Sequence, residues 1–346
     1  MTTIPRPWLF AGALALAAAG ATCSVQAAEK ITWNLSTWGP QRAYTAGIEA
    51  MAAQVEKASG GNFTIRIHYS EAISPAKENL DGLKIGAFEM ATICTAYHPG
   101  KNPAMTTLDL PFLPLPTLKI QQDVSEELYK EEAIKKEMAR WNAAVTFRSL
   151  LPQSEFMGNG PAPLKLDDWK SMRVRALGGT GQAMTKLGAV PTTVPAPEVY
   201  TGIERGMFQA AAFPFSYSHG AYKIHEVSKW YTFNMAPGSN HCPTLHSITA
   251  FEALPAEYKE MLMATKEPAY EALIAGYKAA DDKWIPIFDK AGLTRITYDD
   301  AQLAELQEKG AKPVWQEWVR EMDGKGVPGQ HLLDVVLKAA KQASGS

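Results

Sequence analysis

The chain has 346 residues, which is long enough for about two domains. Hydrophobic residues make up 46% and charged residues 20%, a composition typical of folded proteins that argues against a disordered chain. The 34 basic and 36 acidic residues give a net charge of -2, so the basic excess that nucleic-acid binding requires is absent. We therefore expect no nucleic-acid partner.

The first 27 residues have the pattern of a cleaved secretory signal. Arg6 precedes an apolar stretch over Trp8–Ala21, and Ser24–Ala27 offers the small residues that a signal peptidase recognises. The alternatives are a membrane anchor, for which an apolar run of about 14 residues is short, and a lipoprotein signal at Cys23. We predict a signal peptide over residues 1–27 and an exported, soluble mature protein.

Cleavage leaves two of the three cysteines, Cys94 and Cys242. They could form one disulfide in an oxidising compartment. Each also lies in an apolar, strand-like run, where a thiol behaves as a small hydrophobic side chain. On this argument we favour unpaired cysteines.

In the first half of the mature chain, strands alternate with helices. Apolar residues alternate with polar ones in the predicted strands, and they recur at helical spacing between them. This β-α-β-α-β order indicates a mainly parallel sheet with ligand-binding loops at the carboxyl ends of its strands. The segments in chain order are strands at 31–36, 63–69 and 90–94, helices at 46–55 and 79–86, a proline-rich apolar loop at 103–116, a helix at about 124–141 and a strand at 144–150.

A proline- and glycine-containing stretch over 152–163 indicates a boundary or hinge, after which the pattern restarts. A helical region over about 256–290 would reach roughly 50 Å and could brace two lobes. The further segments are strands at 172–177, 207–212, 245–251 and 294–298, helices at 181–187 and 198–205, and a last helix containing Val314 and Trp318.

The sequence offers only weak signs of enzyme chemistry. Gly178–Gly181 follows a strand and precedes a helix, as in a dinucleotide-binding turn, but Met184 stands where that pattern needs its third glycine. His241 and His246 are predicted to lie on opposite faces of a strand. Asp167-Asp168 and Asp281-Asp282 match no metal motif, since adjacent carboxylates are common at helix starts. We expect no cofactor, no metal site and no catalytic residue.

Binding-type side chains remain. Trp38 follows the first strand, and Tyr97 and His98 follow the third. Arg173 and Arg175 share one face of a strand, and one of them should enter an apolar setting that invites a carboxylate partner. That partner could be a ligand, or an internal acid such as Glu155 or Glu198. The alternating Phe213, Phe215 and Tyr217 could line a pocket, although aromatic residues are more often buried in a core.

Four stretches together resemble the solute-binding subunit of tripartite ATP-independent periplasmic (TRAP) transporters, the DctP-like family. They are Leu83–Ala91, Leu110–Leu113, Asp168–Arg175 and Leu187–Gly206. The resemblance extends from about Lys30 to Glu321. It implies a two-lobed α/β fold with a ligand cleft between the lobes and a long helix that spans both. The expected division is residues 28–152 plus about 240–285 in lobe I, and 153–239 plus about 286–346 in lobe II.

The resemblance also implies that an arginine in the second lobe binds the ligand's carboxylate, and the alignment places this role on Arg175. This agrees with the chemistry of the side chain, because a guanidinium matches a carboxylate with two parallel hydrogen bonds. The sequence departs from the family at Ala176, where a proline is usual, and at Phe213, where a polar ligand contact is frequent. A second arginine found in some members falls near Glu155.

These departures make a small dicarboxylate a poor candidate. With Trp38, Tyr97, Phe213, Phe215 and Tyr217 as candidate walls, we expect a monocarboxylate with a bulky or aromatic body. Glu155 and His98 are further candidate contacts. The implied partner is the membrane permease of a TRAP transporter, and we expect a monomer. The alternatives are an exported enzyme on the same scaffold and a receptor for a C4-dicarboxylate or keto acid.

Overall fold

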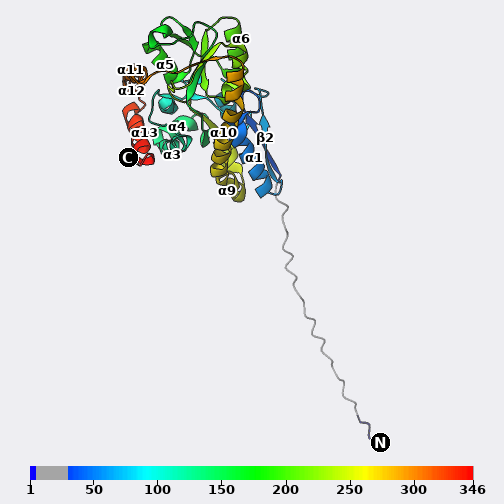
Figure 1. Ribbon diagram of the computed structural model, residues 1–346. Helices are drawn as coiled ribbons and strands as arrows, with labels where there is room; N and C mark the ends of the chain where they lie inside the picture. The colour runs from blue at the N-terminus through cyan, green and yellow to red at the C-terminus, as the bar shows by residue number, and fades with distance from the viewer. Residues whose placement is uncertain (5–29, 346) are drawn as a thin grey trace.

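The computed structural model describes residues 1–4 and 30–345, so most of the predicted signal peptide lies outside the described residues. Two mixed sheets organise the chain (Figure 1). Sheet A has the order β2-β1-β3-β10-β4, and sheet B has the order β11-β9-β5-β8-β6-β7. No helix in the described part of the chain is both long and apolar enough to cross a membrane.

Sheet A begins with three parallel strands, and β10 runs antiparallel between β3 and β4. Its strands form where apolar side chains alternate: Trp33 and Leu35 of β1 are buried, whereas Thr32 is exposed. The five strands are β1 (Ile31–Ser36), β2 (Phe63–His68), β3 (Met90–Thr92), β4 (Ala143–Ser149) and β10 (Cys242–Ser247).

Sheet B has a central antiparallel pair, β5 and β8, and β6 runs parallel to both β7 and β8. The stretch that was predicted as a boundary therefore contains a strand, β5, and the chain crosses between the sheets just before it. The six strands are β5 (Ser154–Gly158), β6 (Arg173–Arg175), β7 (Val190–Thr192), β8 (Ala210–Pro214), β9 (Trp230–Thr232) and β11 (Thr294–Ile296).

The helices on the sheet A side are α1 (Ala46–Ala58), α2 (Asn79–Ile85), α3 (Leu118–Leu128), α4 (Glu132–Ala139), α8 (Ile248–Ala253) and α9 (Ala256–Ala264). The predicted single helix over about 124–141 is two helices, because Thr117 caps α3 early and Tyr129–Glu131 separates it from α4. The strand predicted over 245–251 ends at Ser247, whose side chain accepts a hydrogen bond from Ala250 N and starts α8.

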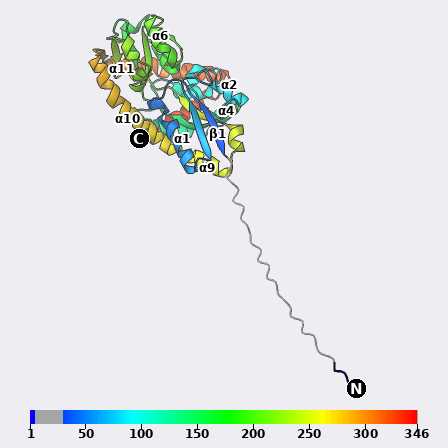
Figure 2. The same cartoon turned by 90° about the vertical axis from the view of Figure 1, so that its right-hand side faces the viewer.

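The remaining helices include the bridge between the two sheets. α10 (Lys266–Lys290) contacts α1 on the sheet A side and α7 on the sheet B side, and Figure 2 shows it running along both halves. At 1.5 Å per residue its 25 residues span about 38 Å. The helices on the sheet B side are α5 (Gly178–Lys186), α6 (Val199–Glu204), α7 (Tyr217–Ala221) and α11 (Asp300–Gly310).

The C-terminal helices contact both sides of the molecule. α12 (Lys312–Gly324) touches both α5 and α13 (Gly329–Ala343), and α13 packs along α3 on the sheet A side. Leu332 and Val336 of α13 are fully buried in the same apolar cluster as Leu108 and Val124. This last helix therefore returns to the first half of the molecule, because its apolar face finds its partners there.

Candidate functional site

A narrow cavity of about 30 Å³ lies between the two halves of the molecule. Its walls come from both sheets and from the segments that cross between them. Sheet A and its loops contribute Trp38, Arg42, Tyr44, Cys94, Tyr97, Asn240 and Cys242; Leu151 lies on a crossing segment; and the sheet B side contributes Arg175, Leu177, Ala196, Phe213, Pro214, Tyr217, Ser218 and Tyr222. The cavity thus combines aromatic rings with two guanidinium groups.

Arg175 is the last residue of β6 and is only 1% exposed. Its Nε and Nη2 donate to the carbonyl of Val194, at 3.1 and 3.0 Å, and its Nη1 donates to the carbonyl of Ala212 at 2.7 Å. A guanidinium has five N–H donors. The three bonds therefore leave one N–H on each terminal nitrogen, beside the Tyr97 side chain; a carboxylate can accept hydrogen bonds from such a pair of N–H groups.

The Arg175 charge has no acidic partner inside the protein. Among residues 30–345, none of the ion pairs within 4 Å involves Arg175, so neither Glu155 nor Glu198 neutralises it. Burial lowers the pKa of Arg175 from its usual range, and the neighbouring Tyr97 opposes this shift. Since a guanidinium stays charged in a protein, the site presents a buried cation to whatever enters the cavity.

Aromatic rings surround this cation. The Arg175 guanidinium lies 4.6 Å from the centre of the Phe213 ring, which stacks on Tyr222 at 5.6 Å with an interplanar angle of 7°. On the opposite wall, Trp38 and Tyr97 make an edge-to-face contact at 5.7 Å. These rings exclude water, and exclusion of water strengthens the attraction between the guanidinium and an anion.

A hydrogen bond joins the two halves beside the cavity. The Tyr97 hydroxyl, which follows β3, accepts a hydrogen bond of 3.0 Å from Ala196 N on the sheet B side. Tyr222 from the sheet B side also lies against Gly39 of sheet A's first loop: a Cβ at Gly39 would collide with the Tyr222 hydroxyl, and the φ of Gly39 is +66°. The structure therefore shows the halves in contact around the cavity.

Five of the eight residues predicted for the site line this cavity: Arg175, Phe213, Trp38, Tyr97 and Tyr217. The other three, Glu155, His98 and Phe215, lie outside its walls. The Phe215 ring contacts Tyr231, Phe233 and Phe288 instead. Both ring nitrogens of His98 are buried without a hydrogen-bond partner, and burial lowers the pKa of His98 to about 4, so this imidazole is neutral.

Glu155 is turned away from the cavity by the alternation of β5. Its carboxylate accepts hydrogen bonds from Thr232 Oγ1, Met235 N and Ala236 N, so it secures the loop that follows β9. Burial raises the pKa of Glu155 to about 7. The predicted bond from this carboxylate to the ligand would require breaking these three contacts.

Sequence reasoning missed Arg42 and Tyr222. Arg42 stands in the loop after β1, and its guanidinium lies 4.7 Å from the Tyr44 ring centre and 5.6 Å from that of Tyr222. The sequence did contain a signal for Arg42. It lies four residues after Trp38, in a loop at the carboxyl end of a parallel strand, where ligand-binding side chains are common. Tyr222 had no such signal, since only the packing of the segment after α7 brings it to the cavity.

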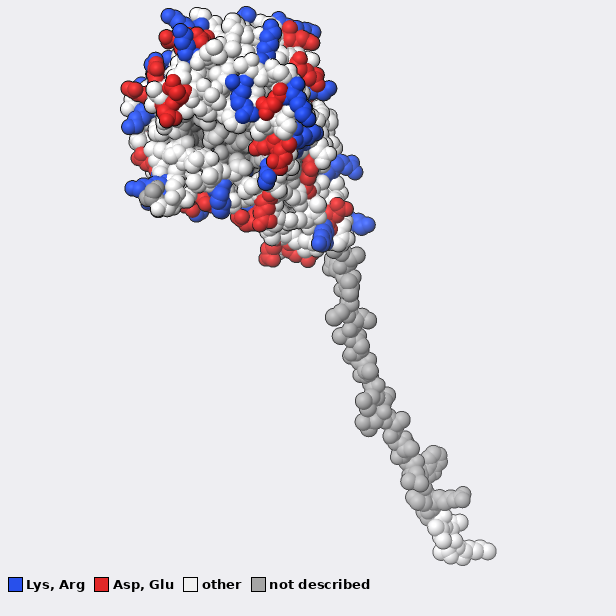
Figure 3. All heavy atoms as spheres, viewed as in Figure 1, with Lys and Arg blue, Asp and Glu red and all other residues white. Residues whose placement is uncertain are grey.

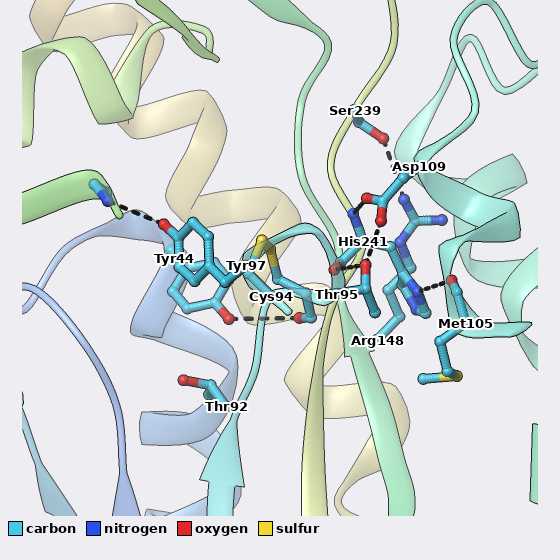
Figure 4. The surroundings of a disulfide bond; sticks show 12 residues. Tyr44, Thr92, Cys94, Thr95, Tyr97, Met105, Asp109, Arg148, Ser239 and His241 are labelled. Carbon is cyan, nitrogen blue, oxygen red and sulfur yellow. Dashed lines mark hydrogen bonds between the residues drawn. A yellow bond between two sulfur atoms is a disulfide. The ribbon is translucent and has the colours of Figure 1, made fainter. Parts of the chain in front are cut away.

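The two cysteines form a disulfide, so the prediction of unpaired cysteines was wrong (Figure 4). The reason is the sheet register: β3 and β10 are antiparallel neighbours with Thr92 opposite Thr244, and continuing this pairing by two residues places Cys94 opposite Cys242. Their Cα atoms are 4.0 Å apart. The disulfide forms part of the cavity wall contributed by sheet A.

On the other side of the disulfide lies a buried polar cluster, which includes Asp109, His241 and Arg148 (Figure 4). Asp109 accepts hydrogen bonds from Thr95 Oγ1 and His241 N. Burial raises the pKa of Asp109 to about 7, against the opposing effects of these bonds and of the Arg148 charge. The cluster belongs to segments of the sheet A side, and Arg148 does not line the cavity at Arg175.

The features that suggested a cofactor or metal have structural roles. A Cβ at Gly179 would collide with the backbone of Asp109, so this glycine allows close contact between α5 and the sheet A side. Asp281 accepts hydrogen bonds from Ser216 N and Oγ and thereby joins α10 to the end of β8. Within the described residues, no group of three or more His, Cys, Asp or Glu side chains could hold a metal ion.

Comparison with known proteins gives a consistent result. The family model for DctP, bacterial extracellular solute-binding protein family 7, matches residues 36–321. The chain is 25% identical to a monocarboxylate 2-oxoacid-binding periplasmic protein of Nostoc sp., over 86% of this chain and 82% of the relative. It is 24% identical to the 2,3-diketo-L-gulonate-binding periplasmic protein of Escherichia coli, over 82% and 84%.

Solved structures confirm the predicted fold class. A TRAP solute-binding protein from Rhodoferax ferrireducens, in complex with copurified benzoate, superposes with a TM-score of 0.82 at 19% identity, covering 91% of this chain and 99% of that one. A marine metagenome TRAP solute-binding protein specific for aromatic acids, in complex with 3-hydroxybenzoate, gives a TM-score of 0.81 at 18% identity with the same coverage. The chain belongs to the DctP family, bacterial extracellular solute-binding protein family 7.

Proposed function

We propose that this protein is a periplasmic receptor that captures an organic acid and delivers it, chemically unchanged, to the membrane permease of a TRAP transporter. The observation that carries the proposal is the buried guanidinium of Arg175, which lines the interlobe cavity and has no acidic partner within 4 Å among the described residues. A buried cation without a counter-ion is costly. A carboxylate ligand supplies the missing charge and the acceptors for the two remaining N–H groups.

The lining of the cavity supports a monocarboxylate with a compact aromatic or bulky body. The walls around Arg175 are rings, chiefly Trp38, Tyr97 and Phe213, and the narrow cavity of about 30 Å³ has to widen by movement of the lobes or side chains to admit a small acid. Relatives point to the same chemical class, since the Rhodoferax structure holds benzoate and the Nostoc relative is named for 2-oxoacids. An aliphatic keto acid is therefore the main competing ligand.

Binding is coupled to closure of the two lobes in this proposal. The carboxylate binds Arg175 on the sheet B side, and the body of the ligand contacts Trp38 and Tyr97 on the sheet A side. Because the ligand touches both lobes only when they are closed, it stabilises the closed state. The bond from Ala196 N to the Tyr97 hydroxyl then joins the lobes beside the bound ligand.

A thermal-shift screen of the mature protein against aromatic, branched aliphatic and 2-oxo acids tests this function. A ligand present at 100 times its dissociation constant should stabilise the protein by about 2.7 kcal/mol. The ligand should be recovered unchanged after incubation, because the role is transport; conversion to a product would instead favour an exported enzyme. Failure of every acid to raise the melting temperature would refute the proposal.

The export prediction has its own test. Expression of the full chain in a bacterium with a periplasm, followed by fractionation and N-terminal sequencing, should yield a periplasmic protein that begins at Ala28. A protein that retains residues 1–27, or that remains in the cytoplasm, would contradict the predicted signal peptide.

A further inference from the structure

Tyr222 places its ring against the opposite lobe. The residue follows α7 on the sheet B side, whereas Gly39 belongs to the loop after β1 on the sheet A side. A Cβ added at Gly39 would overlap the Tyr222 hydroxyl and would lie only 2.9 Å from Cζ of that ring. Gly39 also has a φ of +66°, which other residues rarely adopt. The glycine therefore makes room for Tyr222 where the two lobes meet.

Arg42 of the same loop holds the ring from the sheet A side. Its guanidinium lies 5.6 Å from the Tyr222 ring centre, and Nη1 donates to the carbonyls of Trp38 and Pro40 in its own lobe. Aromatic faces attract a cation. The Tyr222 hydroxyl has no hydrogen-bond partner in the protein, so the ring carries this contact and the hydroxyl does not.

The Tyr222 ring also reaches the arginine that is proposed to bind the ligand. Tyr222 stacks on Phe213 at 5.6 Å with an interplanar angle of 7°, and the Phe213 ring lies 4.6 Å from the Arg175 guanidinium. The carbonyl of the neighbouring Ala212 accepts a hydrogen bond from Nη1 of Arg175 at 2.7 Å. Because the two rings are stacked, the position of Tyr222 bears on that of Phe213 and, through it, on that of Arg175.

Contact between the lobes is interrupted, so each place where they meet matters for closure. Figure 3 shows the molecule hollowed between its two lobes, and a cavity of about 350 Å³ is lined by residues 96–110, α5 and α12. The base of Tyr222 is fixed on the sheet B side, since a Cβ at Gly220 would overlap the Trp284 ring of α10. A firmly held ring thus bridges to the opposite lobe.

We propose that Tyr222 is a closure latch: a positioning residue whose ring docks against Gly39 and Arg42 of the opposite lobe and, through Phe213, steadies Arg175 in the closed receptor. The inference rests on the proposed function, because closure around an acid bound at Arg175 is what the latch stabilises. The latch contacts join the two lobes only when these are closed. They therefore slow the release of the ligand and leave the rate of its capture nearly unchanged.

The test is a double-mutant cycle read out by acid binding. Benzoate and pyruvate are the probes, and the acid that binds more tightly is used throughout. Tyr222→Ala should weaken binding about 10-fold in calorimetry, the order expected for a desolvated ring contact. Stopped-flow fluorescence should assign this loss to faster dissociation, with the association rate within about 3-fold of wild type. Tyr222→Phe keeps the ring, so it is the matched control and should bind within about 3-fold of wild type.

Two partners from the opposite lobe complete the cycle. Arg42→Gln should weaken binding about 5-fold in the wild-type background and less than about 2-fold in the Tyr222→Ala background, because the ring that it contacts is then gone. Gly39→Ala should weaken binding about 10-fold alone and less than about 3-fold with Tyr222→Ala, whose smaller side chain leaves space for the added Cβ. Urea denaturation checks that each variant folds. If Gly39→Ala does not fold, the Arg42 cycle decides alone.

The outcomes separate the latch from the proposed function. Additive losses in the Arg42 cycle would overturn the latch, because they mean that Arg42 acts on the ligand without Tyr222. Tyr222→Ala affinity within about 3-fold of wild type, or a loss that comes from slower association, would overturn it as well. In each of these cases an acid that is still lost in Arg175→Met leaves the proposed function standing. Binding that does not depend on Arg175, or no binding of either acid to the wild type, would overturn both.

Discussion

Each half of the molecule buries one arginine on a strand of its sheet, and the two arginines do different things. Arg148 on β4 is 0% exposed and Arg175 on β6 is 1% exposed. Neither takes part in any ion pair within 4 Å between described residues. By burial and charge alone, they are equivalent candidates for ligand binding.

Their surroundings distinguish them. Arg148 donates to the hydroxyls of Ser125 and Ser239, and its charge lowers the pKa of the nearby Asp109, which opposes the larger effect of burial. Arg175 donates to the backbone carbonyls of Val194 and Ala212, has the Tyr97 side chain beside it, and lines the interlobe cavity. Arg148 also keeps a buried Nε without a hydrogen-bond partner, so what distinguishes Arg175 is its position in the wall of the cavity between the two lobes.

The comparison is tested most strongly by removing the charge that faces the cavity. Arg175→Met should weaken binding of the best acid from the thermal-shift screen by about 4 kcal/mol, close to 1000-fold, because the carboxylate is left buried without its partner. Calorimetry measures the loss. Arg173→Gln is the matched control, since Arg173 is on the same strand but exposed, and it should retain wild-type affinity. If Arg175→Met binds the acid as tightly as the wild type, then Arg175 does not bind the ligand and has a structural role like that of Arg148.

Replacing Arg148 should lower the stability of the protein and leave its affinity for the ligand nearly unchanged, the opposite of what we expect for Arg175. Arg148→Met should lower the free energy of unfolding by about 3 kcal/mol, because the hydroxyls of Ser125 and Ser239 lose a partner and Asp109 loses a nearby positive charge. Urea denaturation gives this value, and calorimetry on the folded variant should show an affinity within about 3-fold of wild type. A large loss of affinity with unchanged stability would make Arg148 a ligand-binding residue after all.

The disulfide between Cys94 and Cys242 lies between the cavity and the polar cluster around Arg148. We expect its removal to cost less stability than the loss of Arg148. The double variant Cys94→Ser/Cys242→Ser should lose about 2 kcal/mol of stability, as is usual for removal of a native disulfide. A reducing agent should destabilise the wild-type protein by a similar amount and leave the double variant unchanged. If reduction affects both proteins equally, the cysteines are not paired in solution.

The buried carboxyl groups give the smallest effect. Burial raises the pKa of Glu155 to about 7, above its value of about 4.5 in an unfolded chain. The folded state therefore binds the proton more tightly, so the stability contributed by protonated Glu155 is present below about pH 4.5 and is lost as the pH rises through 7. Between pH 5 and pH 8 the free energy of unfolding should fall less for Glu155→Gln than for the wild type, because glutamine has no proton to lose. Urea titrations at a series of pH values measure this difference. Equal decreases in the two proteins would refute the raised pKa.

Much of the fold could be predicted from local patterns. Alternation placed β1 and β2 within a residue of their observed ends, because one face of each strand must be apolar whatever its neighbours are. The short strands β7 and β9 and the last helix, α13, were not predicted. β7 and β9 have three residues each, and so short a segment carries no periodicity that distinguishes it from a loop.

For the site, the sequence determined which kinds of side chain could bind an acid. The tertiary structure decided which residues line the cavity. An arginine between apolar strand neighbours is a local feature with a strong energetic consequence, which made Arg173 and Arg175 candidates; the family resemblance then assigned the role to Arg175. Glu155 was predicted as a candidate ligand contact in a boundary stretch, but the packing of the loop after β9 turns its carboxylate toward backbone N–H groups. Arg42, Tyr222 and the pairing of Cys94 with Cys242 depend on segments far apart in the chain. Their proximity follows from sheet register and lobe contact, which single-sequence patterns do not contain.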